Sequence, residues 1–162
     1  MAELRKLVED EKALSGISLG ELENTAGLML RIAQLTSFDN FFALYPDGDI
    51  RISEFTVLMA VAENPGIRQG VLADVLKVKW SNMTKLVRTL EEQGLIARDV
   101  SRNDRRAVVL TVTEEGKRQI DESGDRIYRL DRQALSMLSD DEHAQLIALA
   151  RKIAGWPDKG GA

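Results

Sequence analysis

Residues Ile67–Ile96, IRQGVLADVLKVKWSNMTKLVRTLEEQGLI, decide the fold of this 162-residue chain. Their first part carries a helical stripe of apolar residues: Val71, Leu72, Val75 and Leu76. Their second part carries another: Met83, Leu86, Val87 and Leu90. Lys77–Lys79 between the stripes is long enough only for a turn, and Gly94 suits the left-handed end of a helix. We therefore predict a helix-turn-helix.

The second helix of this pair presents a polar face opposite its apolar stripe. Hydroxyls, an amide and cations of this kind reach phosphates and base edges when a helix enters the major groove of DNA. An ordinary solvated helix face is the alternative, and charge alone favours it. Trp80 either packs under the turn or lies near the groove, and packing is favoured because tryptophan buries a large surface. The candidate major-groove residues are Ser81, Asn82, Thr84, Lys85 and Arg88.

A β-hairpin is predicted directly after the helix-turn-helix. Ile96–Val100 and Ala107–Val112 read as strands, with Val108, Leu110 and Val112 on one face. The polar residues between them are turn-prone. The predicted fold is therefore mainly α with a small β-hairpin wing, a winged helix-turn-helix.

Helices are predicted on both sides of this module. Apolar spacing indicates one long helix over residues 19–44 and another helix capped by Ser53. Thr113 is expected to cap a helix with a seven-residue apolar repeat, Ile120, Ile127 and Ala134, beside a second row, Leu130 and Met137.

A capping box predicts the last helix, at Ser139–Glu142, and Gly155 and Pro157 end it. We expect N-terminal dimerisation helices over residues 1–48, a DNA-binding lobe over 49–116 and C-terminal dimerisation helices over 117–162, intertwined as one module.

The composition argues against an enzyme. The chain has no cysteine and a single histidine, His143, in what reads as the first turn of a helix. Thiolate chemistry is therefore impossible, and no catalytic set, cofactor or metal site is expected. No run of apolar residues is long enough to span a membrane, and the N-terminal residues lack the apolar centre of a signal peptide. We therefore expect a cytoplasmic protein.

Charge is distributed unevenly along the chain. Residues 64–118 hold 11 basic and 7 acidic side chains, although the whole chain carries a net charge of −4. A basic island in an acidic protein favours a local anionic partner, although charge also fluctuates along any sequence.

The chain from Ile50 to Gly116 resembles the MarR family of winged-helix transcription regulators. The helix-turn-helix matches in LADVL (72–76) and SNMTKLVRTLEEQGL (81–95), and the most specific match is DRRAVVLTVTEEG (104–116). The resemblance implies a homodimer that binds double-stranded DNA at a palindromic operator, usually as a repressor. It places Arg106 in the minor groove, oriented by Asp104, with Arg105 near phosphate.

Further residues are assigned on the same basis. Arg102 joins the wing contacts, and Lys77 and Lys79 are assigned to the DNA backbone. Members of the family often bind a small aromatic or phenolic effector, and the candidates by location are Phe38, Phe42, Tyr45 and Met59. A simple role in the core is the favoured alternative for these four, because aromatic side chains bury well without any ligand.

Two other classes of function remain open on the sequence. A winged helix can serve as a protein-interaction module without specific DNA binding. A small-molecule enzyme on a helical dimer is conceivable, but no nucleophile, metal set or cofactor loop supports it. Fold resemblance alone does not settle function, so the polar helix face and the wing have to carry the DNA-binding hypothesis.

Overall fold

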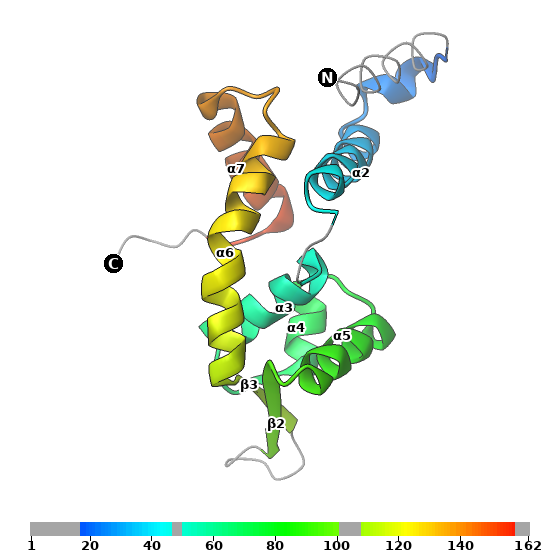
Figure 1. The fold of residues 1–162 in the computed structure, drawn as a ribbon. Coiled ribbons are helices and arrows are strands. Elements are labelled where there is room, and N and C mark those ends of the chain that lie inside the picture. The colour runs from blue at the N-terminus through cyan, green and yellow to red at the C-terminus, as the bar shows by residue number, and fades with distance from the viewer. Residues whose placement is uncertain (1–16, 47–49, 101–107, 158–162) are drawn as a thin grey trace. The chain divides into compact units, whose positions relative to one another are not determined.

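The computed structural model describes residues 17–46, 50–100 and 108–157. They form helices and one small sheet, in agreement with the predicted mainly α fold (Figure 1). The chain divides into two compact units, residues 1–40 and 41–162. Within the described ranges, no helix has both the length and the apolar character that a membrane crossing requires.

The predicted helix over residues 19–44 is interrupted near its start. A short 3-10 helix, η1 (Gly20–Asn24), precedes α2 (Ala26–Leu44). Thr25 separates them with extended backbone angles, φ −94° and ψ 126°, and its hydroxyl donates to the Leu22 carbonyl at 2.7 Å. Threonine side chains compete with helix continuation in this way. Apolar spacing continues across the break, so periodicity alone did not reveal it.

The winged-helix lobe, by which we mean the described residues between 50 and 112, begins with α3 (Ile52–Glu63). The predicted cap at Ser53 is wrong, because Arg51 occupies the cap position. The Glu54 carboxylate accepts from the Arg51 N–H at 3.3 Å, and this bond starts the helix before Ser53. A helix-turn-helix follows, α4 (Gln69–Val75) and α5 (Trp80–Glu92), as predicted.

The wing is part of a three-stranded antiparallel sheet in the order β1–β3–β2. The predicted hairpin consists of β2 (Ile96–Val100) and β3 (Val108–Val112), paired from Ile96↔Val112 to Val100↔Val108. The third strand, β1 (Ile67–Arg68), pairs with β3 and was not predicted. Two residues are too short to show an alternating pattern, so only their tertiary partner identifies them as a strand.

The core of the lobe is closed within one chain. Leu58 and Val61 of α3, Met83 and Leu90 of α5 and Leu110 of β3 have no measurable exposure. Burying each such side chain contributes about 1.5–3 kcal/mol. This shared core fixes how α5 is rotated about its own axis, and therefore which of its residues face solvent.

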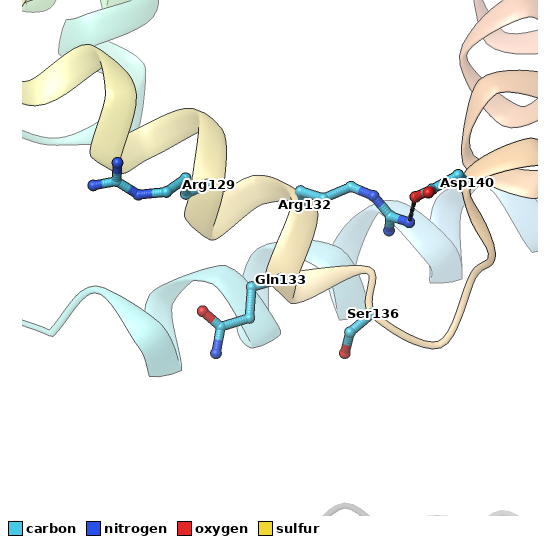
Figure 2. A pocket seen from close by; sticks show the side chains of 5 residues that line it. All are labelled: Arg129, Arg132, Gln133, Ser136 and Asp140. Atoms are coloured by element: carbon cyan, nitrogen blue, oxygen red, sulfur yellow. Dashed lines mark hydrogen bonds and ion pairs between the residues drawn. The ribbon is translucent and has the colours of Figure 1, made fainter.

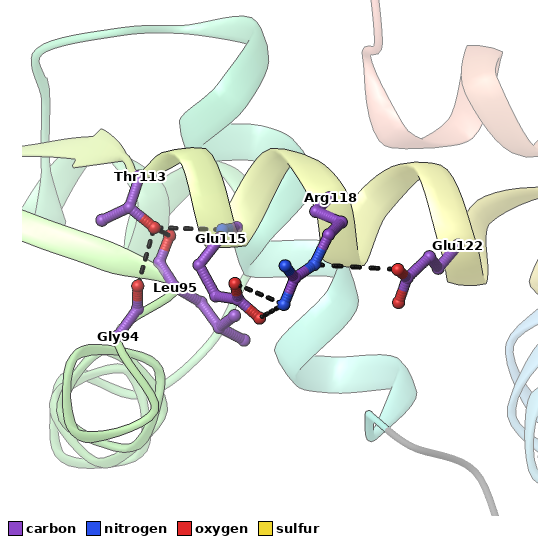
Figure 3. A network of polar contacts seen from close by, with 7 residues as sticks. Gly94, Leu95, Thr113, Glu115, Arg118 and Glu122 are labelled. Atoms are coloured by element: carbon purple, nitrogen blue, oxygen red, sulfur yellow. Dashed lines mark hydrogen bonds and ion pairs between the residues drawn. The ribbon is translucent and has the colours of Figure 1, made fainter.

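Helix α6 (Glu114–Ala134) starts on the sheet through a small polar network (Figure 3). The Thr113 hydroxyl accepts from the Gly116 N–H at 3.0 Å, as the predicted cap requires, and donates to the Gly94 carbonyl at 2.7 Å. A Cβ atom on Gly116 would overlap the Leu95 carbonyl oxygen and lie 2.8 Å from Val112 Cγ2. Gly116 is therefore required for the close approach of α6 to the sheet.

Helix α7 (Asp140–Ala154) has the predicted ends. The Ser139 hydroxyl accepts from the Glu142 N–H, the Glu142 carboxylate accepts from the Ser139 N–H, and Gly155 ends the helix with φ 61°. Ile127 and Ala134 of the predicted α6 repeat are buried, whereas Met137 lies beyond the end of α6 and is exposed. The second apolar row therefore stops at Leu130.

Candidate nucleic-acid interface

Helix α5 turns a polar face toward solvent. Its other side is held against α3 and α4 by Met83, Val87 and Leu90, which are fully buried. Four of the five predicted major-groove residues are exposed, and Thr84 is half-buried. The exposed four are Ser81, Asn82, Lys85 and Arg88. They offer a hydroxyl, an amide and two cations, the groups that hydrogen-bond base edges and phosphates.

Positive charge gathers at the start of α5. Lys77, Lys79 and Lys85 are exposed, and none of the three forms an ion pair within the described residues. Lys79 is the N-cap of α5 and its side chain caps no backbone N–H, although the Asn82 N–H donates to the Lys79 carbonyl at 2.9 Å; the start of the helix is also the positive end of the helix dipole. This combination attracts an anion to the N-terminal end of α5.

The second half of α5 is electrostatically different. Arg88 Nε lies 2.7 Å from Glu92 Oε1, and Arg98 Nε of β2 lies 2.8 Å from Glu91 Oε2. The hydrogen bond to Glu92, aided by its charge, raises the pKa of Arg88 above its ordinary value. Two carboxylates thus offset two arginines here, and the net positive potential of α5 falls toward its C-terminal end.

Two side chains near the turn lie where the sequence did not place them. Trp80, whose packing under the turn was the favoured expectation, is 62% exposed, so the structure does not support that expectation. Gln69, the first residue of α4, is buried and donates from Nε2 to Thr84 Oγ1 at 2.9 Å. No periodic signal in the sequence connects two residues fifteen positions apart.

The four predicted wing contacts, Arg102, Asp104, Arg105 and Arg106, lie outside the described residues. The two strands that bracket them are described, and their last pair is Val100↔Val108.

The predicted effector residues differ in exposure. Phe38 and Phe42 are 44% and 48% exposed, Tyr45 is 6% exposed, and Met59 is half-buried against the core. Tyr45 also carries a buried hydroxyl without a hydrogen-bond partner among the described residues. The Arg126 guanidinium carbon lies 4.7 Å from the centre of the Tyr45 ring. Sequence reasoning did not identify Arg126, which belongs to α6.

An open depression of about 530 Å³ lies elsewhere, near the junction of α6 and α7 (Figure 2). The residues that line it are Arg129, Arg132, Gln133, Ser136 and Asp140. None of them is a predicted effector residue. Arg132 is already bound to Asp140 at 2.6 Å and to the Leu138 carbonyl at 3.2 Å. The described residues contain no cluster of three acidic or histidine side chains that could hold a metal.

Comparisons with known proteins agree with this geometry. The MarR family model matches residues 50–108. A Thauera aromatica protein, whose name proposes a transcriptional regulatory role for the hcr operon, is 32% identical over 135 residues, covering 83% of this chain and 81% of the relative.

Two solved structures share the fold over nearly their whole length. The transcriptional repressor CouR, bound to a 23-mer DNA duplex, superposes with a TM-score of 0.75 at 27% identity, covering 85% of this chain and 98% of CouR. A MarR-family transcriptional regulator from Rhodococcus sp. RHA1 gives a TM-score of 0.69 at 25% identity, with coverage of 85% and 98%. Together with the helix-turn-helix, the wing strands and the flanking helices, these matches establish that the chain belongs to the MarR family of transcription regulators.

Proposed function

We propose that this regulator is a homodimeric repressor that binds a palindromic DNA operator and is released by a small aromatic or phenolic effector. The observation that carries the proposal is the exposed polar face of α5, set beside an accumulation of lysines at its N-terminal end. CouR, which is similar over 85% of this chain, is a repressor seen on duplex DNA, and this supports the same role here.

The interface reads sequence through α5 and gains affinity through phosphate contacts. Ser81, Asn82, Lys85 and Arg88 face the major groove, while Lys77 and Lys79 lie on the backbone. Arg106, oriented by Asp104, enters the minor groove, Arg105 lies near phosphate, and Arg102 is a further wing contact. Affinity that depends on neutralised phosphates falls steeply as salt rises.

Exposed apolar side chains on α7 support the homodimer. No residue of α7 is buried, and Leu149 and Ile153 are 60% and 66% exposed. Leu146 and Ile147 of α7, and Trp156 just after it, are also exposed. A contiguous set of apolar side chains is covered by a partner in most soluble proteins. A second copy of this chain brings the same set, which makes a two-fold interface self-complementary.

The effector proposal rests on Tyr45 and Arg126. A buried hydroxyl without a partner costs free energy, and a bound phenol or carboxylate oxygen would satisfy it. The neighbouring guanidinium supplies the cation that an organic anion requires. Titration of benzoate into the protein–operator complex tests this, and Tyr45→Phe is expected to weaken release without weakening operator binding.

Selection of bound sites from random duplex DNA tests the central proposal. A recovered palindrome would establish sequence reading and two-fold geometry together, because half-site spacing mirrors the protein dimer. Binding without saturation or sequence preference would instead favour the alternative, a winged-helix module that binds only proteins.

Arg106→Ala tests the wing. Loss of a minor-groove arginine is expected to weaken operator binding about 10- to 100-fold, while the dimer and the melting temperature stay unchanged. Normal binding of the variant in a salt-matched titration would show that the wing assignment is wrong.

A further inference from the structure

The Thr84 hydroxyl lies at the junction of the two helices of the helix-turn-helix. It accepts a hydrogen bond from Gln69 Nε2 at 2.9 Å and donates one to the Trp80 carbonyl at 2.9 Å. A hydroxyl has one proton to donate and two lone pairs with which to accept. In this arrangement its proton is already used, so Thr84 has no donor left for a phosphate oxygen or for the acceptors of guanine.

Gln69, which donates this hydrogen bond, is buried in the lobe. The residue is 9% exposed and lies in the first turn of α4. The bond joins that turn to the second turn of α5, across fifteen residues of chain. Because a buried amide donor that loses its partner costs free energy, the link favours one rotation and one height of α5 relative to α4.

A second contact fixes the same junction. Gly70 follows Gln69, and a Cβ atom placed on it would lie 3.4 Å from Trp80 Cζ3. The Trp80 ring thus lies against the backbone of α4 by one edge, although most of the ring is exposed. The start of α4 therefore touches α5 at two places, an apolar contact at Trp80 in the first turn and a polar contact at Thr84 in the second turn.

We propose that Gln69 and Thr84 are positioning residues, which set the pose of α5 for DNA reading, and that Thr84 does not itself read a base. This inference rests on the proposed function and deepens it. Under this inference the base-reading residues of α5 are the four exposed ones, Ser81, Asn82, Lys85 and Arg88. The hydrogen bond between Gln69 and Thr84 then contributes to sequence specificity without contacting DNA. A shift of about 1 Å in a supporting contact is enough to misplace several hydrogen bonds at once.

Thr84→Val tests the proposal, because it keeps the shape of the side chain and removes the hydroxyl. We expect the variant to lose about tenfold in affinity for the operator selected by the wild type. Its affinity for random duplex at the same salt concentration should change less than twofold. The loss should extend over every base pair that α5 reads, because all of its contacts shift together. Thr84→Ser keeps the hydroxyl and should restore binding.

Thr56→Val is the matched control. The Thr56 hydroxyl donates to the Ile52 carbonyl at 2.7 Å, the same type of bond that Thr84 makes to Trp80, but Thr56 is exposed on α3 and has no side-chain partner among the described residues. This control should bind the operator normally. Gln69→Leu should reproduce the Thr84→Val loss, and the double variant should be no weaker than either single variant, as expected for two residues that act through one contact.

The outcomes separate this inference from the proposed function. If the wild type selects no site, the proposed function fails and the inference fails with it. If the wild type selects a site, three results would overturn only the inference. The first is relaxed specificity at a single base pair in Thr84→Val, which would make Thr84 a direct reader. The second is an equal loss for operator and random duplex together with a lower melting temperature. The third is additive loss in the double variant.

Discussion

The winged-helix lobe and helix α7 differ in the exposure of their apolar side chains. In the lobe, Leu58, Met83 and Leu110 have no measurable exposure. On α7 no side chain is buried, and Leu149 and Ile153 are more than half exposed. Both regions contain helices with regular apolar spacing. The difference teaches that periodicity predicts an apolar face but not what covers it.

The lobe completes its core inside one chain, and the proposed DNA reading by α5 depends on that rigidity, because the helix would have to present its polar face at a fixed angle. The apolar side chains of α7 stay exposed in the single chain, and a dimer interface is proposed there. Four comparisons between variants break or sharpen this contrast.

Gly116→Ala is expected to have the largest effect. The added Cβ would overlap the Leu95 carbonyl oxygen, a backbone atom that cannot rotate away, so we expect a loss of about 3–5 kcal/mol in the free energy of unfolding. Urea denaturation measures it. Gly27→Ala is the control: Gly27 lies in the first turn of α2, an added Cβ would meet no atom within 4 Å apart from its chain neighbours and the local helix backbone, and the variant should gain up to about 1 kcal/mol in stability. Equal stability of the two variants would contradict the close approach of α6 to the sheet.

Leu58→Ala in the lobe, set beside substitutions on α7, compares a buried apolar side chain with exposed ones. Removing this fully buried side chain should cost about 3 kcal/mol in stability. Leu149→Ser combined with Ile153→Ser should leave the lobe folded but shift the oligomer toward monomer, as measured by light scattering over a range of concentrations. An unchanged oligomeric state in the double variant would argue against α7 as the dimer surface.

Glu92→Gln tests the electrostatic difference between the two halves of α5. It removes the carboxylate that pairs with Arg88 and leaves that arginine free for phosphate. We expect about two- to threefold tighter DNA binding, since exposed pairs of this kind are weak. Glu63→Gln, on the exposed end of α3, is the control for loss of one negative charge. Identical gains in both variants would assign the effect to net charge alone.

Asp140→Asn should have the smallest effect. The hydrogen bond from Arg132 holds the pKa of Asp140 below its ordinary value of 3.8. A carboxyl whose pKa falls on folding contributes stability above its unfolded pKa, and this contribution is lost as the pH falls through the folded value. The variant should therefore be slightly less stable than wild type at pH 7 and equal to it in strong acid. Asp141→Asn, which removes a charge from the same helix turn but no ion pair among the described residues, provides the baseline for a urea series over pH.

Much of the fold could be predicted because its signals are local. The caps at Thr113 and Ser139 and the left-handed glycines at 94 and 155 each depend on residues within a few positions. The order of helices, the helix-turn-helix and the two wing strands follow from apolar spacing between these stops. The exposure of the polar face of α5 was also predicted from helical periodicity. Four of the five polar residues named from the sequence lie opposite the buried apolar stripe and are exposed.

The tertiary structure decided the rest, because those features depend on contacts between residues distant in sequence. Strand β1 exists only because β3 pairs with it, and Gly116 matters because the Leu95 carbonyl lies against it. Composition marked Thr84 as a candidate base reader, but the structure commits its hydroxyl to Gln69 and Trp80. A sequence states which groups can form a hydrogen bond, and only the packed chain determines which of them have already formed one.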